Sequence, residues 1–86
     1  MDPKVTKLFQ KKNLVFIATI NSDGSPQLTP VWGNYGDEHI LINTAEGRLK
    51  HKNIQRDPRV AVSVVDHDNP LTMTTIRGKV VQIIPD

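Results

Sequence analysis

The sequence predicts a mainly β domain, in which an antiparallel sheet of five strands curls into a barrel beside two short helices. Apolar runs rich in β-branched residues are separated by clusters of Gly, Pro, Asn and Asp, which form tight turns. Two other stretches, residues 3–12 and 47–56, space their apolar residues as helices do. A chain of 86 residues accommodates one domain, 1–86, with a thin core.

The first half of the chain is predicted to hold a helix and three strands. Residues 3–12 begin with a proline, which suits the first turn of a helix. Residues 14–20 are apolar throughout and largely β-branched, as in a central strand covered on both faces. The turn residues at 21–26 predict a hairpin to an antiparallel strand over 27–35. A second turn leads to a strand over 39–43.

The second half is predicted to hold a helix and two strands. The helix over 47–56 follows Thr44, whose hydroxyl is placed to cap it, and an Asp-Pro pair ends it. Residues 59–65 predict another buried strand. Residues 71–84 are long enough for one strand that bends at a bulge at Gly78.

Composition excludes several function classes. The absence of cysteine excludes disulfides and thiolate chemistry, and the three histidines are too scattered to predict a metal site. The N-terminus is charged before any apolar run, and no run approaches the roughly 20 apolar residues of a membrane span. We therefore expect a cytoplasmic protein without a membrane partner. A net charge of +2 is too small to predict nucleic-acid binding by itself.

The basic residues are concentrated in one segment. Residues 44–60 contain five of the 11 Lys and Arg residues. A helix start offers free backbone N–H groups and the positive end of its dipole. Arg48 and Lys50, in the first turn of the predicted helix, therefore predict a phosphate site.

Helical geometry divides this segment into two faces. Lys50 and Asn53 fall between Leu49 and Ile54, so they point at the body of the protein if both apolar residues pack on the sheet. A buried ammonium needs an anionic partner. If Asp57 or a carbonyl is the partner of Lys50, the helix is only a solvated basic face. If the partner is a ligand phosphate, the helix is a binding site. Nucleic-acid backbone is the third candidate partner. The outer face holds Arg48, His51, Lys52, Gln55 and Arg56.

Residues 24–32 form a second candidate site. Proline cannot donate to a sheet ladder, so Pro30 indicates an edge or a break where neighbouring backbone is free to bind a planar heterocycle. Thr29 and Val31 share one face of this strand, and Trp32 lies on the other. The alternative for Trp32 is bulk in the core or in a dimer interface. The sequence lacks G-x-S-x-G, H-E-x-x-H and G-x-G-x-x-G motifs, so any catalysis requires a cofactor.

Four blocks, in this order and spacing, resemble the pyridoxamine 5'-phosphate oxidase-like split β-barrel flavoproteins. They are LVFIAT at 14–19, DGSPQLTPVW at 23–32, Asn-Thr with a basic helix ending in DPRV at 43–60, and IRGKV at 76–80. The resemblance implies an antiparallel Greek-key split β-barrel that forms a homodimer. It also implies that FMN or the deazaflavin coenzyme F-420 binds in clefts at the subunit interface. Such a protein transfers hydride between the cofactor and a small organic substrate.

The resemblance also implies roles for single residues. Lys50 is the clearest match for a phosphate ligand, joined by Thr44 and Arg48, and Asn53 shares its inward face. Met73 lies where the family lines the cleft. The ring is flanked, through backbone contacts, by Thr29, Pro30, Val31 and Trp32.

Two departures from the family narrow this expectation. Thr29 stands where true pyridoxamine phosphate oxidases have arginine, so that activity is not expected, and the Pro-Val-Trp block is more similar to the deazaflavin branch. Family members usually continue beyond the strand ending at Ile84, so residues 1–86 correspond to a fragment or to a minimal form. The alternatives are a flavin-storage module without turnover and a small basic barrel that binds single-stranded nucleic acid.

Overall fold

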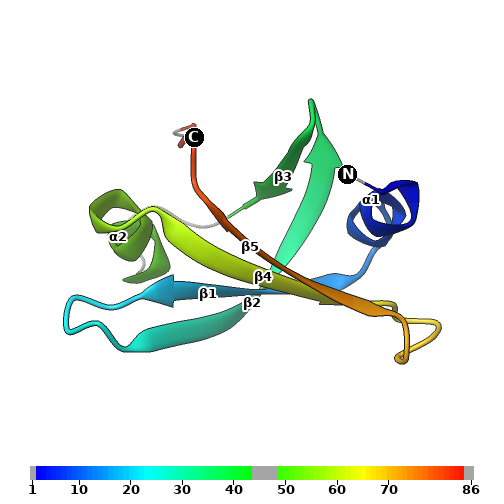
Figure 1. Ribbon diagram of the computed structural model, residues 1–86, viewed down its shortest axis with the longest axis horizontal. Coiled ribbons are helices and arrows are strands. Elements are labelled where there is room, and N and C mark those ends of the chain that lie inside the picture. The colour runs from blue at the N-terminus through cyan, green and yellow to red at the C-terminus, as the bar shows by residue number, and fades with distance from the viewer. Residues whose placement is uncertain (1, 44–48, 85–86) are drawn as a thin grey trace.

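The computed structural model describes residues 2–43 and 49–84 (Figure 1). Its elements are α1 (Pro3–Gln10), β1 (Leu14–Ile20), β2 (Pro26–Gly36), β3 (His39–Ile42), α2 (Leu49–Arg56), β4 (Arg59–Val65) and β5 (Met73–Lys79). The predicted order of helices and strands is confirmed. The predicted cap at Thr44 lies outside the described residues. No helix in the described ranges is both long enough and apolar enough to cross a membrane.

The five strands form one antiparallel sheet in the order β3-β2-β1-β4-β5. β1, β2 and β3 follow one another through hairpins, and the connection through α2 then brings β4 to the other side of β1. This is the Greek-key arrangement. The sheet curves into a half-barrel, and both helices lie on its concave side (Figure 1). The predicted fold class is confirmed.

Two hairpin turns use the residues that the sequence offers for them. At the first, Gly24 has φ of 88°, and the Asn21 N–H donates to the Ser25 carbonyl at 2.8 Å. At the second, Asp37 and Glu38 have φ of 51° and 61°, as the two central residues of a type I′ turn do. These turns fix the register of β2 against both of its neighbours.

The core lies on the concave side, which we call the inner face. Along β1 the buried residues alternate, and Leu8 and Phe9 of α1 pack on the same face. The prediction that both faces of β1 are covered is not met within the described residues, because Leu14 on the convex outer face is 44% exposed. The buried apolar core consists of Leu8, Phe9, Val15, Ile17, Val31, Val62 and Val64.

The last strand differs from its prediction. Gly78 pairs with Val60 and Lys79 pairs with Arg59 in one unbroken register, so the predicted bulge at Gly78 is wrong. The strand also ends at Lys79 rather than at residue 84. The next N–H, of Val80, donates to the carbonyl of Pro58 at 2.8 Å, outside the paired strands.

Polar contacts attach α1 to the loop between β4 and β5. Lys11 Nζ lies 3.0 Å from Asp66 and 3.2 Å from Asp68. The hydrogen bond to Asp66 is the main reason that the pKa of Lys11 is raised and that of Asp66 lowered. Asn13, only 2% exposed, donates to the Leu8 carbonyl and accepts from the His67 N–H, both at 2.9 Å. These contacts lie at the opposite end of the sheet from α2 (Figure 1).

Candidate functional site

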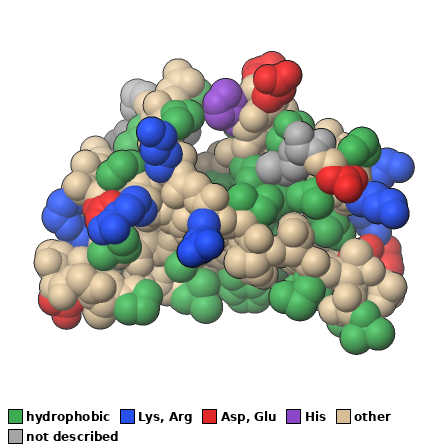
Figure 2. All heavy atoms as spheres, viewed as in Figure 1, with side chains coloured by type: hydrophobic (Ala, Val, Ile, Leu, Met, Phe, Trp, Pro, Cys, Tyr) green, Lys and Arg blue, Asp and Glu red, His purple; other side chains and the backbone are tan. Residues whose placement is uncertain are grey.

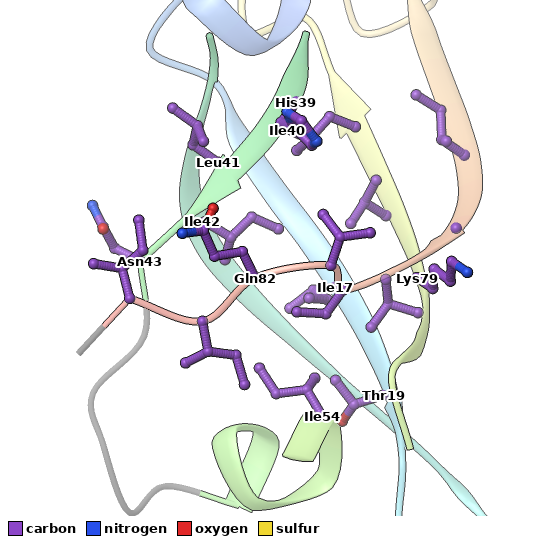
Figure 3. A pocket seen from close by; sticks show the side chains of 18 of the residues that line it. Ile17, Thr19, His39, Ile40, Leu41, Ile42, Asn43, Ile54, Lys79 and Gln82 are labelled. Atoms are coloured by element: carbon purple, nitrogen blue, oxygen red, sulfur yellow. The ribbon is translucent and has the colours of Figure 1, made fainter. Parts of the chain in front are cut away.

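The inner face encloses a cavity of about 710 Å³, bordered by α2, β3 and the chain that follows β5. Figure 3 shows Ile17 of β1, Ile42 of β3 and Ile54 of α2 around it, with the segment that carries Gln82 crossing beside them. The lining is mostly apolar. Its β-branched apolar residues from the strands and α2 are Ile17, Ile40, Ile42, Ile54, Val60, Val62 and Ile76.

Lys50 brings a positive charge to this cavity, whose lining also includes the charged residues Asp37, Glu38 and Lys79. It lies in the first described turn of α2, is half-buried, and lines the cavity together with Ile54. Its predicted protein partner, Asp57, instead binds Arg59, with Arg59 Nη2 2.7 Å from the carboxylate. Within residues 2–43 and 49–84, no ion pair or hydrogen bond of the Lys50 side chain is found. A half-buried ammonium in such surroundings is suited to an anionic ligand.

The orientation of α2 agrees with prediction in part. Asn53 is fully buried and Lys52 is exposed, as expected. Leu49, which was predicted to pack on the sheet, is 51% exposed. Arg56 was predicted to meet only solvent, but its guanidinium donates to the Ile20 carbonyl at 2.6 Å. Polar contacts to the end of β1 therefore hold the helix. The apolar pattern alone predicted that Leu49 would hold it.

Asn53, a predicted cofactor ligand, does not line the cavity. Its amide nitrogen donates to Thr19 Oγ1 at 3.0 Å and to Asn21 Oδ1 at 2.9 Å. Its oxygen accepts from Arg56 Nη2 at 2.9 Å. With both amide protons engaged and no exposed surface, the side chain binds β1 rather than a ligand. Sequence reasoning missed the roles of Thr19 and Asn21, although their polar side chains stand out at the end of an apolar strand.

The prediction for Pro30 is confirmed. β2 pairs with β1 over residues 26–32 and with β3 only over 33–36, so the other edge of residues 26–32 has no strand beside it in the described chain. Val31 is 7% exposed and belongs to the core, so its side chain is closed to a ligand. The Thr29 hydroxyl is buried without a hydrogen-bond partner among the described residues.

The predicted site residues are divided between two faces of the sheet. Lys50 lines the cavity on the inner face, and Thr29 also faces inward, paired with Ile17. Trp32 and Met73 lie on the outer face, where they are 59% and 57% exposed. The free edge of β2, at residues 26–32, borders both faces. Thr44 and Arg48 lie outside the described residues.

The whole chain, residues 1–86, matches the family model described as pyridoxamine 5'-phosphate oxidase. The chain belongs to this family. The half-barrel of antiparallel strands agrees with this membership, because the solved structures similar to the chain share its fold.

Several solved structures are similar to nearly all of this chain. An F420 reductase has a TM-score of 0.86 and 35% identity, over 93% of this chain and 64% of its own. The conserved hypothetical protein Rv2991 of Mycobacterium tuberculosis has a TM-score of 0.76 and 29% identity, over 92% of this chain and 51% of its own. HupZ of Group A Streptococcus, at 20% identity and a TM-score of 0.72, shows the fold alone. The chain thus spans between about half and two thirds of these proteins.

The described residues fit a phosphate-bearing cofactor. Lys50 supplies an ammonium that no described carboxylate neutralises. The buried Thr29 hydroxyl lacks a partner, and the edge of β2 beside it is free. These are the groups that a flavin-type molecule requires: a cation for the phosphate and hydrogen-bonding atoms for the ring.

Proposed function

We propose that this chain binds FMN or the deazaflavin coenzyme F-420 by its phosphate, as part of an oxidoreductase that transfers hydride between the cofactor and a small organic substrate. One observation carries the proposal: the half-buried Lys50 ammonium borders an apolar cavity without a described counter-ion. The 35% identity to an F420 reductase favours the deazaflavin.

The protein's own contribution is binding and exclusion of water. Lys50 holds the phosphate as a point charge, and its attraction is stronger beside apolar side chains than in bulk water. The backbone from Thr29 to Trp32 flanks the ring along the free edge of β2. When bound, the cofactor supplies the hydride chemistry. The branched side chains of the inner face exclude water from the part of the cavity that they line.

We also propose that the functional unit is a homodimer formed through the outer face of the sheet. Hydrophobic side chains line the lower edge of the molecule in Figure 2, below β1 and β2. Leu14, Leu28, Trp32 and Met73 on this face are 44 to 66% exposed, an unusual concentration for a surface that meets only water. One self-complementary patch is what a twofold dimer uses.

Replacement of Lys50 tests the phosphate site. Lys50→Ala should weaken binding of FMN or F-420 by about 1.5–3 kcal/mol, or roughly 10- to 150-fold, the range for hydrogen bonds to charged groups. Lys52→Ala, on the exposed side of the same helix, should bind as the wild type does. Titrations followed by flavin fluorescence and deazaflavin absorbance measure both.

Two results would contradict the proposal. Equal losses in the Lys50 and Lys52 variants would show that the phosphate does not meet the inward lysine. A wild-type protein that binds neither cofactor would refute the function itself. Turnover of the reduced cofactor with a panel of acceptors then distinguishes an enzyme from a flavin-storage module.

A further inference from the structure

A polar cluster around the buried Asn53 side chain fixes α2 to the end of β1. Asn53 donates to Thr19 Oγ1 and Asn21 Oδ1, and Arg56 donates to the Ile20 carbonyl and to Asn53 Oδ1, at distances from 2.6 to 3.0 Å. The contacts reach three consecutive residues of the chain. Because Asn53 has no exposed surface, each hydrogen bond of its side chain replaces one that water would have made.

This cluster determines how the helix is rotated as well as where it lies. An apolar side chain tolerates sliding and rolling, since the hydrophobic effect has no direction. Hydrogen bonds do have a direction, and a roll of α2 would leave the buried Asn53 amide unpaired, at about 1–3 kcal/mol for each lost bond. Packing of Leu49 against the sheet does little to fix the helix, since this side chain is 51% exposed.

The rotation matters for Lys50. It lies three residues before Asn53, and residues three apart are neighbours on a helix surface. A slip by one residue turns the helix by about 100°, which would carry Lys50 away from the cavity that it lines. The contacts of Asn53 therefore fix the direction of the lysine.

We propose that Asn53 is a positioning residue, which holds Lys50 at the cavity and so sets the preference of the site for a phosphate-bearing ligand. This inference rests on the proposed function. Asn53 makes no contact with the ligand. Its effect on binding passes through Lys50 and is absent when Lys50 is absent.

Asn13 provides a matched control. It is also a buried asparagine, 2% exposed, with hydrogen bonds to the Leu8 carbonyl and from the His67 N–H. It anchors α1 rather than α2. Asn13→Ala should therefore destabilise the protein in a way similar to Asn53→Ala, without redirecting Lys50.

The experiment compares ligands with and without phosphate: FMN against riboflavin, and F-420 against its phosphate-free deazaflavin alcohol. Asn53→Ala should weaken the phosphate-bearing ligand by roughly three- to thirtyfold and leave the phosphate-free one nearly unchanged. Asn13→Ala should leave the ratio of the two affinities as in the wild type. In a Lys50→Ala background, Asn53→Ala should add less than about twofold, because the residue through which it acts is gone.

The outcomes separate the inference from the function on which it rests. If the wild type binds neither phosphate-bearing ligand, the proposed function fails and the inference fails with it. If the wild type prefers the phosphate, but Asn53→Ala weakens both ligands equally or adds its full loss to that of Lys50→Ala, only the inference is overturned. Arg56→Gln, at an exposed residue, tests the same point should Asn53→Ala not fold, and an unchanged ligand ratio would overturn the inference.

Discussion

A methyl group added at Gly33 should destabilise the fold, whereas the same change at Gly78 should not. A Cβ at Gly33 would lie 3.0 Å from Val15 Cγ2 and 3.3 Å from the Leu41 carbonyl oxygen, closer than the 3.5–4.0 Å at which carbon atoms ordinarily pack. Neither neighbour can retreat. Val15 is fully buried and has a stiff β-branched side chain, and the Leu41 atom belongs to the backbone of β3.

The magnitude follows from two opposed effects. Overpacking of this kind costs about 1–3 kcal/mol, and replacing glycine in a strand returns about 0.5–1 kcal/mol by restricting the unfolded chain. Gly33→Ala should therefore lose about 1 kcal/mol, and at most about 2.5 kcal/mol. A domain of this length has about 4–13 kcal/mol in total.

Urea unfolding of the two variants measures the difference. A Cβ at Gly78 would meet no atom within 4 Å, so Gly78→Ala should be neutral or stabilising by up to about 1 kcal/mol, with an unchanged m-value. A Gly33→Ala protein as stable as Gly78→Ala would refute the packing argument. A strong loss of stability in Gly78→Ala would instead support the bulge that the sequence predicts at this position.

Two further predictions concern the outer face and the acid range. Trp32 is 59% exposed, so a dimer interface could bury roughly 90–150 Å² of its surface. This burial would stabilise the dimer by at most about 2–4 kcal/mol per subunit. Measured by sedimentation, the dimer Kd should rise at least about tenfold in Trp32→Ser. Leu71 is 92% exposed and lies outside the strands, so Leu71→Ser should leave the dimer Kd unchanged. A monomeric wild type would contradict the proposed dimer. The Arg59 guanidinium, and then its N–H, lower the pKa of Asp57 from 3.8 to about 2, so this stabilisation is present above pH 3.8 and is lost as the pH falls through 2. Unfolding free energy should therefore depend less on pH between 4 and 2 in Asp57→Asn, and identical slopes would count against the Asp57–Arg59 contact.

Features set by local sequence are predicted well. Residues 14–20 and 59–65 are strands with the predicted bounds, and both hairpins form at the predicted turns. Turn residues and β-branched runs act over a few positions, so the sequence carries their effect directly. Pro30 was similarly informative, since a missing N–H excludes one side of a strand from pairing wherever the strand lies.

Features that depend on distant partners are predicted poorly. Asn53 rather than Leu49 anchors α2, because Asn53 donates hydrogen bonds to Thr19 and Asn21. These partners lie more than 30 positions away in the chain. No periodicity rule favours an amide over a leucine for the buried position. Lys50 lies at the inner face, whereas Trp32 and Met73 lie on the outer face. This separation likewise depends on the folded sheet, because strand pairing sets which residues share a face.

The inward direction of Lys50 was nevertheless predicted correctly from a premise that is half wrong. The premise placed both Leu49 and Ile54 against the sheet, and the bisector of those two positions passes near Lys50 and Asn53. In the structure Ile54 and the half-buried His51 line the cavity, although His51 was predicted on the outer face, so the contact face is rotated toward His51 from the expected one. Because Asp57 binds Arg59, the inward lysine lacks the partner that would make it merely structural. A cation that a polar cluster directs at an apolar cavity is more readily explained by a ligand than by the fold.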